Sequence, residues 1–519
     1  MSDQTPANSP TPPDFNIFPD QPGQGGPWQA TGAWDGADTA PRRDTPDKGT
    51  RRSRLIALLV AVLCIAGVMT LQQIGALSEE KVDTTKVEAP GAGDQFLLSS
   101  GIMVKMSGLL RSLQPSGIPS NETRMLADNV QESATSPVDK FRALIVAAEV
   151  AGVDDALPKL ETAAKDGIEY PGSEDDITTL RAIFQGGIDT LTATERDTLV
   201  ARHGYFGRLA LTLGKPDTDP ARQPFFRNSA ALLAFFAALC GFVLLIFAGS
   251  VTSSIYMIIR VASGKVRASF LPPAPGGSVY LEMVALLAAS FLLLQIVGSL
   301  VLSKLFGEKN TENGLLAALA LQWLLLPVIF WPVLRGVPLK EHARRIGWTR
   351  GEGLLKEMWT GLYAYLASLP IFVCVVVVMV VLMVIYNAIM HGGKPEPLQA
   401  KNEILEIVAQ GKPLILAMFF LLATVWAPLV EESVFRGALF RHMRGVTGVV
   451  LSALVSALAF SVMHGYAFFL LAPVFTLGII FAAMREWRSS LVASITAHAL
   501  HNGTLLTIVI TMLTLARPE

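Results

Sequence analysis

The chain of 519 residues carries 42 Lys and Arg against 43 Asp and Glu; only 16% of its residues are charged and 51% are hydrophobic. A mean hydropathy of +0.44 over this length requires a large apolar surface that never meets water, which excludes an ordinary soluble protein. The balanced charge offers no basic excess to neutralise phosphates, so no nucleic-acid partner is expected. All three cysteines lie in apolar runs, which argues against a disulfide framework and against a zinc ribbon.

Residues 1–54 are rich in Pro, Gly, Asp and Ser and have no apolar period, so we expect a disordered cytoplasmic tail. Several arginines at the end of this tail precede an apolar run from Leu55 to about Ala76, which is long enough to cross a hydrocarbon core of about 30 Å. A cleaved signal peptide would begin nearer the N-terminus. Residues 55–77 are therefore predicted to be a retained signal anchor.

Residues 78–224 are less apolar and carry the start signals of short helices. Ser136 with Pro137 and Asp139 is typical of a capped helix start, and Thr192 with Glu195 has the spacing of a capping box. These signals predict a small helical domain inserted between spans on the extracytoplasmic side. Nothing in its sequence indicates a chemical function.

Residues 225–519 are predicted to be a polytopic membrane domain. Lys and Arg gather in alternate loops between the apolar runs, and cytoplasmic loops carry such an excess, so these loops should lie on the side of the N-terminal tail. The fold class that follows is an all-α transmembrane bundle of about nine spans. It comprises the anchor and eight further runs, at about 229–251, 279–303, 314–334, 362–388, 412–430, 446–463, 466–484 and 490–515.

Ionisable groups inside spans are costly and therefore mark candidate functional sites. The first such cluster is Glu431 with Glu432, where an apolar helix runs directly into two carboxylates. Glu432 and Arg436 are four residues apart and share a helix face, so they can neutralise each other. Glu431 is offset by about 100° and is predicted to be free to face a different cavity.

Two further clusters stand in the following spans. His464 ends an otherwise uncharged run, and His498 and Asn502 lie four residues apart on one face of the last run. Our run limits place His464 at the outer end of its span, which conflicts with a site near the cytoplasmic membrane face. A carboxylate, two imidazoles and an amide suit water activation and oxyanion binding, as in a hydrolase without a covalent nucleophile.

In this order, the three clusters match the motifs Glu-Glu-x-x-x-Arg, Phe-x-x-x-His and His-x-x-x-Asn. The sequence here resembles the CPBP family of intramembrane proteases, also called the ABI or type II CAAX prenyl endopeptidase family, over about residues 413–510. The matching residues are Glu431, Glu432, Arg436, Phe460, His464, His498 and Asn502.

The resemblance implies that Glu431 activates a water together with His464. It also implies that His498 and Asn502 stabilise the oxyanion and that Glu432 and Arg436 hold the site in shape. His501 is outside the family pattern and is expected to face away from the site.

These residues leave open whether the site binds a metal ion. Glu431, His464 and His498 could supply zinc with a carboxylate and two imidazoles. A glutamate cannot easily be both a ligand and the only general base, which favours metal-independent water activation. The chain contains no His-Glu-x-x-His motif of the zincins.

The leading hypothesis is an intramembrane endopeptidase that hydrolyses a peptide bond at the cytoplasmic side of the membrane. Its expected partners are the lipid bilayer and a peptide or protein substrate presented at it. The alternative is a non-enzymatic membrane scaffold or a proton-coupled transporter that uses the same Glu and His residues; a transporter would be favoured by an inverted repeat, and none is seen. Low cysteine content and spans rich in Ala and Val favour a bacterial inner membrane.

Overall fold

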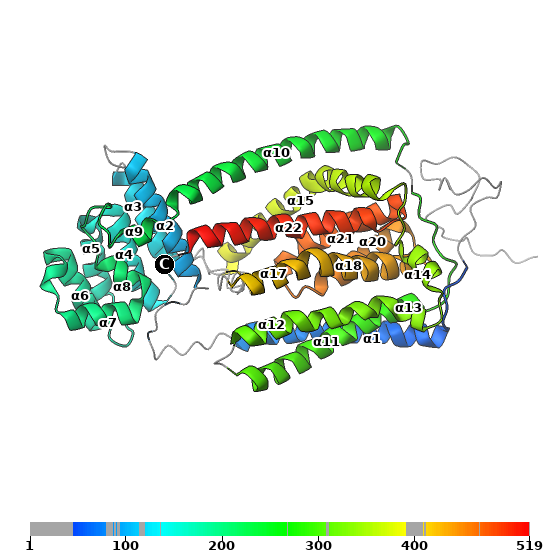
Figure 1. Cartoon of the computed structure of the whole chain (residues 1–519), viewed down its shortest axis with the longest axis horizontal. Helices are drawn as coiled ribbons and strands as arrows, with labels where there is room; N and C mark the ends of the chain where they lie inside the picture. The colour runs from blue at the N-terminus through cyan, green and yellow to red at the C-terminus, as the bar shows by residue number, and fades with distance from the viewer. Residues whose placement is uncertain are drawn as a thin grey trace, which may run out of the picture.

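The computed structural model describes residues 45–78, 87, 90, 94–113, 120–134, 136–266, 268–307, 311–390, 408, 412–466 and 468–517 (Figure 1). The described residues form helices and no β-strand, so the predicted all-α class is confirmed. Residues 1–44, which make up most of the predicted disordered tail, lie outside the described residues.

Within the described part of the chain, nine helices are long and apolar enough to cross a membrane. Eight of them coincide with predicted spans; the ninth is α2 (Gln95–Leu113), in the predicted external domain. The run at 446–463 forms only α20 (Val449–Val462), which is too short to count. Three of the other candidate spans are made of several elements: α9 (Gln223–Phe226) with α10 (Ser229–Ala262); α12 (Thr311–Gln322) with η3 (Trp323–Phe330) and α13 (Trp331–Leu334); and the helix 413–444. The remaining spans are the single helices α1 (Arg51–Ser78), α11 (Val279–Phe306), α15 (Leu354–Met390), α21 (Leu471–Arg488) and α22 (Val492–Ala516).

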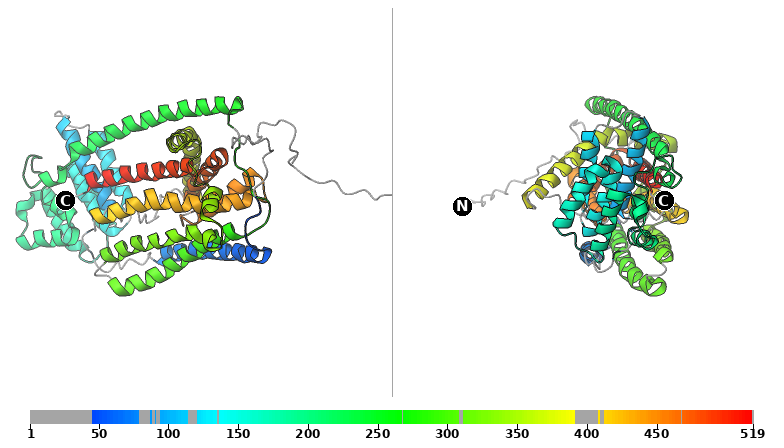
Figure 2. Two further views of the ribbon diagram at one scale, coloured as in Figure 1. Left: turned by 45° about the vertical axis from the view of Figure 1, so that its right-hand side comes forward. Right: turned by 90° about the vertical axis from the view of Figure 1, so that its left-hand side faces the viewer.

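Short helices between α1 and α10 form a domain at one end of the molecule (Figures 1 and 2). The N-cap prediction is confirmed, because Ser136 Oγ accepts a hydrogen bond from the Asp139 N–H, and Thr192 and Glu195 form the capping box. These helices share a hydrophobic core of their own, to which α2 also contributes. The helices are α2 to α9, including α3 (Ser120–Ser133), α4 (Pro137–Ala151), α5 (Val153–Lys165), α6 (Ser173–Gly186), η1 (Ile188–Thr190), α7 (Ala193–His203) and α8 (Tyr205–Ala210).

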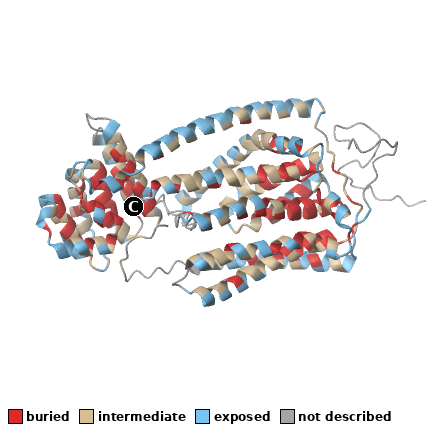
Figure 3. Ribbon diagram, in the orientation of Figure 1, coloured by how far each residue is buried: buried red, intermediate tan, exposed pale blue. Residues whose placement is uncertain are grey.

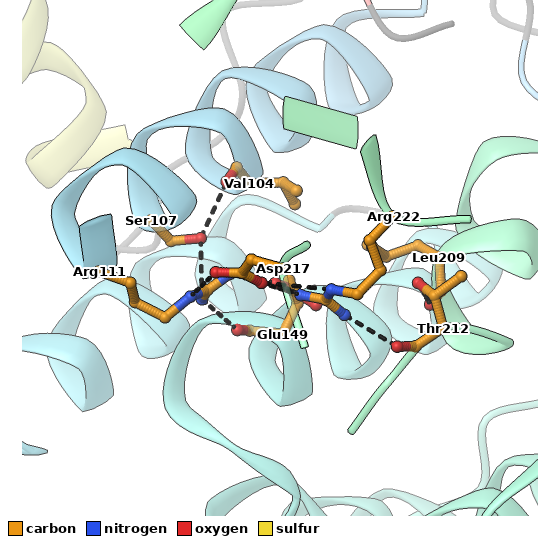
Figure 4. A network of polar contacts seen from close by, with 8 residues as sticks. All are labelled: Val104, Ser107, Arg111, Glu149, Leu209, Thr212, Asp217 and Arg222. Carbon is orange, nitrogen blue, oxygen red and sulfur yellow. Dashed lines mark hydrogen bonds and ion pairs between the residues drawn. The ribbon is translucent and has the colours of Figure 1, made fainter. Parts of the chain in front are cut away.

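A buried carboxylate ties the first and last helices of this domain together (Figure 4). Glu149 Oε1 lies 2.6 Å from a guanidinium nitrogen of Arg111 and 2.6 Å from one of Arg222. Asp217 contacts both arginines from the other side. Because the Glu149 side chain is only 2% exposed, its charge depends on these partners for stabilisation.

Replacing Glu149 by Gln is expected to lower the free energy of unfolding of this domain by about 2 kcal/mol, the range for a hydrogen bond to a charged group. Pulse proteolysis of the full-length protein in urea measures the loss. The matched control is Glu161→Gln, because Glu161 pairs with Arg181 on the surface and its side chain is 39% exposed. The control should leave the midpoint nearly unchanged; equal losses in both variants would contradict the role of burial.

The domain is attached directly to the last membrane helix. Lys105 of α2 is 2% exposed, and its ammonium donates to the carbonyls of Leu515 at 2.8 Å and Arg517 at 3.0 Å, at the C-terminal end of α22. A cation there is favourable because it faces the negative end of the helix dipole.

The opposite end of the molecule carries the basic loops and the segment before α1 (Figures 1 and 2). Asp47 is 5% exposed, and its Oδ1 accepts from Arg345 of α14 (Leu339–Ile346) at 2.8 Å and from Arg441 at 3.1 Å. The Lys48 carbonyl accepts the N–H groups of Ser278 and Val279. The chain that enters α1 is therefore built into the core at this end.

Buried residues of the membrane part gather in the half nearer the basic end, whereas the long α10 is exposed along most of its length (Figure 3). Exposed Leu, Ile, Val and Phe side chains cover α10 and α15, as expected for helices that face lipid. Helices α20, α21 and α22 pack with the helix 413–444 inside this shell. The candidate site lies among these four helices.

Candidate active site

The glutamates lie on one continuous helix that contains two wide π-helical turns. Its parts are α17 (Pro413–Leu421), η4 (Leu422–Trp426), α18 (Ala427–Glu431), η5 (Glu432–Leu439) and α19 (Phe440–Arg444). In the π turns the backbone pairs five residues apart: Ala427 N–H donates to Leu422 O, and Phe440 N–H donates to Phe435 O. Such turns are rare and recur at functional sites. Here one turn ends at Trp426, shortly before Glu431, and the other begins at Glu432.

Glu432 and Arg436 form the predicted pair. Glu432 Oε1 lies 2.9 Å from Arg436 Nη1, and both side chains are fully buried. The guanidinium lies 4.1 Å above the ring of Phe460 and 5.2 Å from that of Phe481, and it also donates to the carbonyl of Gly478. Aromatic faces and hydrogen bonds offset the cost of burying a charge, so the pair is held in one orientation.

One imidazole lies between the two glutamates. His498 Nδ1 is 3.1 Å from Glu432 Oε1, and its Nε2 is 3.8 Å from Glu431 Oε2. The two carboxylates therefore do not face different cavities, as their helical offset predicted. Each contacts a different nitrogen of the His498 ring. They differ in exposure: the Glu431 side chain is 20% exposed, although its Oε2, which faces His498, is buried, while Glu432 has no exposure. Glu431 is therefore the less enclosed of the two carboxylates.

His464 lies beside the other residues of the site. Its ring centroid is 4.8 Å from that of Phe460, and the Phe460 centroid is 5.8 Å from that of His498. The helix α20 ends at Val462 and Gly465 turns the chain with φ +64°, so His464 follows a short helix and does not stand at the outer end of a full span. His464 Nδ1 bonds to Phe460 O at 2.8 Å. Between the described side chains of His464 and Glu431 there is no hydrogen bond or ion pair.

Asn502 binds a backbone carbonyl in the first π turn. Its Nδ2 donates to Ala423 O at 2.8 Å. In the π turn the donor to this carbonyl would be residue 428, which is a proline without an N–H. One amide proton of Asn502 is therefore engaged, and the second remains for another acceptor.

His501 faces away from the glutamates, as expected. Its Nδ1 lies 2.9 Å from the hydroxyl of Tyr365, and its ring packs against Tyr365 and Phe372 of α15. It thus joins α22 to the neighbouring span.

The three side chains named as candidate zinc ligands do not converge as they lie. Within the described residues, no group of three or more His, Cys, Asp and Glu side chains is placed as metal ligands would be. Glu431 and His498 are close. His464 Nδ1 bonds to the Phe460 carbonyl, which leaves Nε2 as the ring nitrogen that could bind a ligand.

Several residues that shape the site were not predicted. Phe481 stacks on the His498 ring at 5.2 Å, and Gly478 lets α21 approach α20, since a Cβ there would lie 2.7 Å from Ala457 Cβ. Ser456 and Trp348 bond to η5 at Phe435 O and Ser433 Oγ. An apolar residue, a glycine or a serine in a span is ordinary, so no sequence signal separates them from packing residues.

Comparison with known proteins gives one match. Residues 413–504 match the model of a family described as type II CAAX prenyl endopeptidase Rce1-like. All six predicted site residues fall inside this range. No curated protein and no solved structure matches the chain.

Proposed function

Because residues 413–504 are a domain of the Rce1-like type II CAAX prenyl endopeptidase family, whose members are generally proteases, we propose that this chain is an intramembrane endopeptidase. The observation that supports this most is the pair of carboxylates on the two nitrogens of His498, one paired with Arg436 and fully buried, the other 20% exposed with its buried Oε2 free of hydrogen bonds to the described residues. A structural ion pair would need only Glu432. The Glu431 carboxylate is therefore available for chemistry.

In the proposed reaction, Glu431 takes a proton from a water molecule while that water attacks the carbonyl carbon of the scissile peptide bond. The tetrahedral intermediate carries its negative charge on the former carbonyl oxygen. Its collapse breaks the C–N bond, and the leaving nitrogen receives the proton that Glu431 took up. His464, whose ring packs on Phe460 next to His498, is proposed to orient the water.

His498 and Asn502 are proposed to donate hydrogen bonds to the oxyanion. His498 Nδ1 faces Glu432 and donates to it, so Nε2 carries a proton only in the imidazolium form. Asn502 contributes the amide proton that Ala423 does not use. Two donors on one face of α22 can then meet a single oxygen.

This chemistry gives a kinetic prediction for α22. Asn502→Ala should lower kcat by about 10²–10³ with little change in KM, as expected when one oxyanion donor is removed. Cleavage of a peptide substrate by the purified protein in nanodiscs measures it. His501→Ala is the control: it removes the bond to Tyr365 and some stability, but should keep most of kcat. A fully active Asn502→Ala variant, or a stable but inactive His501→Ala variant, would contradict this assignment and would place the oxyanion donor on the other side of the helix.

The test of the function itself is cleavage by the purified protein of two peptide classes, a prenylated Cys-a-a-X tail and an unmodified transmembrane peptide, followed by mass spectrometry. Activity that survives exhaustive chelation supports water activation by Glu431 alone. Activity that is lost on chelation and restored by zinc would support the metal alternative with Glu431, His464 and His498 as candidate ligands.

We also propose that the basic end faces the cytoplasm of a bacterium and that the α2–α9 domain lies outside its inner membrane. Trypsin added to intact spheroplasts should cleave after Arg124, which is exposed in α3, and should spare Arg335 at the basic end. Inside-out vesicles should show the reverse pattern. Cleavage at Arg335 from the outer face would contradict this orientation and a cytoplasmic site.

A further inference from the structure

Ser456 of α20 contacts the glutamate helix in a way that the proposed mechanism does not use. Its side chain is completely buried, and its hydroxyl donates to Phe435 O at 2.8 Å. Phe435 lies inside the π turn η5, and its carbonyl also accepts the Phe440 N–H. A donor from another helix thus fixes the wide turn that begins at Glu432.

The same arrangement occurs at the other π turn. There Asn502 of α22 donates to Ala423 O within η4. Each wide turn beside the glutamates therefore has one main-chain carbonyl bound by a polar side chain from a neighbouring helix. A π turn is less favourable than regular α-helix, and such contacts from outside keep it in place.

The position of Ser456 on its own helix connects this contact to the site. Ser456 and Phe460 are four residues apart and lie on one face of α20, and His464 follows four residues later, just beyond the end of the helix. The Phe460 ring contacts Arg436, His464 and His498. Ser456 is thus the anchor of the face of α20 that packs on the site.

We propose that Ser456 is a positioning residue. By holding the η5 turn, it sets the position of Glu432 and Arg436 relative to His498. Through His498 it also sets the position of Glu431. The hydroxyl touches no reacting atom in this scheme. Its effect on cleavage rests on the proposed function, whereas its effect on the turn does not.

The chain supplies a matched control in Ser452, one turn earlier on the same face and equally buried. Its hydroxyl bonds to Gly448 O in its own segment and to Thr447 Oγ1, and not to the glutamate helix. Ser452→Ala and Ser456→Ala therefore remove the same atoms at the same burial. Phe435 O keeps the Phe440 N–H in both variants, so the helix should still form.

The first measurement is amide hydrogen exchange of the full-length protein in nanodiscs. Exchange in residues 432–440 should be about tenfold faster in Ser456→Ala than in wild type, which corresponds to the loss of one hydrogen bond, and unchanged in Ser452→Ala. Equal exchange in the two variants, whether slow or fast, overturns the assignment of Ser456.

The second measurement is peptide cleavage. Ser456→Ala should lower kcat about tenfold at constant KM, while Ser452→Ala should resemble wild type. Faster exchange with unchanged kcat would overturn the positioning role in catalysis. If the wild-type protein cleaves neither peptide class, the proposed function fails, and exchange still decides whether Ser456 holds the turn.

Discussion

Glu431→Gln is expected to lower peptide cleavage by at least about 10²-fold, the lower range for the loss of a general base, while the protein stays folded. The amide keeps the shape of the carboxyl group but cannot accept the proton of the attacking water. Glu431 is the partly exposed member of the pair, and among the described residues its one ion pair is with His498 at 3.8 Å. Its replacement therefore costs little stability. Cleavage rates and thermal unfolding of the same purified sample check both halves of this expectation.

The comparison that makes this result specific is Glu432→Gln. Glu432 is sealed and lies against both Arg436 and His498, so its neutralisation should lower stability as well as activity. If the two variants lose equal amounts of stability, or if Glu431→Gln remains active, the division of roles between the glutamates is wrong.

Arg436→Met is expected to destabilise the protein by about 3–5 kcal/mol and to abolish cleavage, because it leaves the carboxylate of Glu432 buried without its cation. The methionine can fill the space between Phe460 and Phe481, so the loss reports charge rather than volume. Thermal unfolding in detergent, together with the yield of monodisperse protein, measures the effect.

Arg444→Met provides the control on the same helix. Arg444 pairs with Glu486 at 2.9 Å near the helix end, where its side chain is 13% exposed. The Glu486 side chain is 6% exposed, and the shortening of Arg444 at the helix end opens space through which water can reach it, so a smaller loss than that of Arg436→Met is expected. A loss as large as that of Arg436→Met would show that the Glu432–Arg436 pair has no special burial cost.

Hydropathy predicted the fold class and eight of the spans, because a run of about 20 apolar residues has few alternatives to a membrane helix. The error concerned α20. Apolar residues continue on both sides of Gly465, and composition alone does not show that the helix ends at Val462 and the chain turns at Gly465. By length and hydropathy α2 also qualifies as a candidate span, while its Leu97 and Val104 belong to the core of the α2–α9 domain, where the sequence placed this segment.

The pairing of Glu432 with Arg436 followed from helical spacing and is present. The relative directions of the Glu431 and Glu432 side chains could not be predicted in the same way. An offset of 100° per residue holds for a regular α-helix, whereas here one π turn ends at Trp426 and another begins at Glu432. His498 between both carboxylates is a contact across 66 positions of sequence. Only packing of α22 against α18 and η5 decides it.

The contacts of Asp47 can form only late in the synthesis of the chain. Its two arginine partners lie 298 and 394 residues further along the chain. At about 5–20 residues per second, synthesis takes roughly 20–80 s to reach the second partner after Asp47 is made. During that interval α1 is available to insert, but the carboxylate before it must remain hydrated. The segment before α1 is therefore among the last to reach its final place, and the basic end closes only when the helix carrying the glutamates has been made.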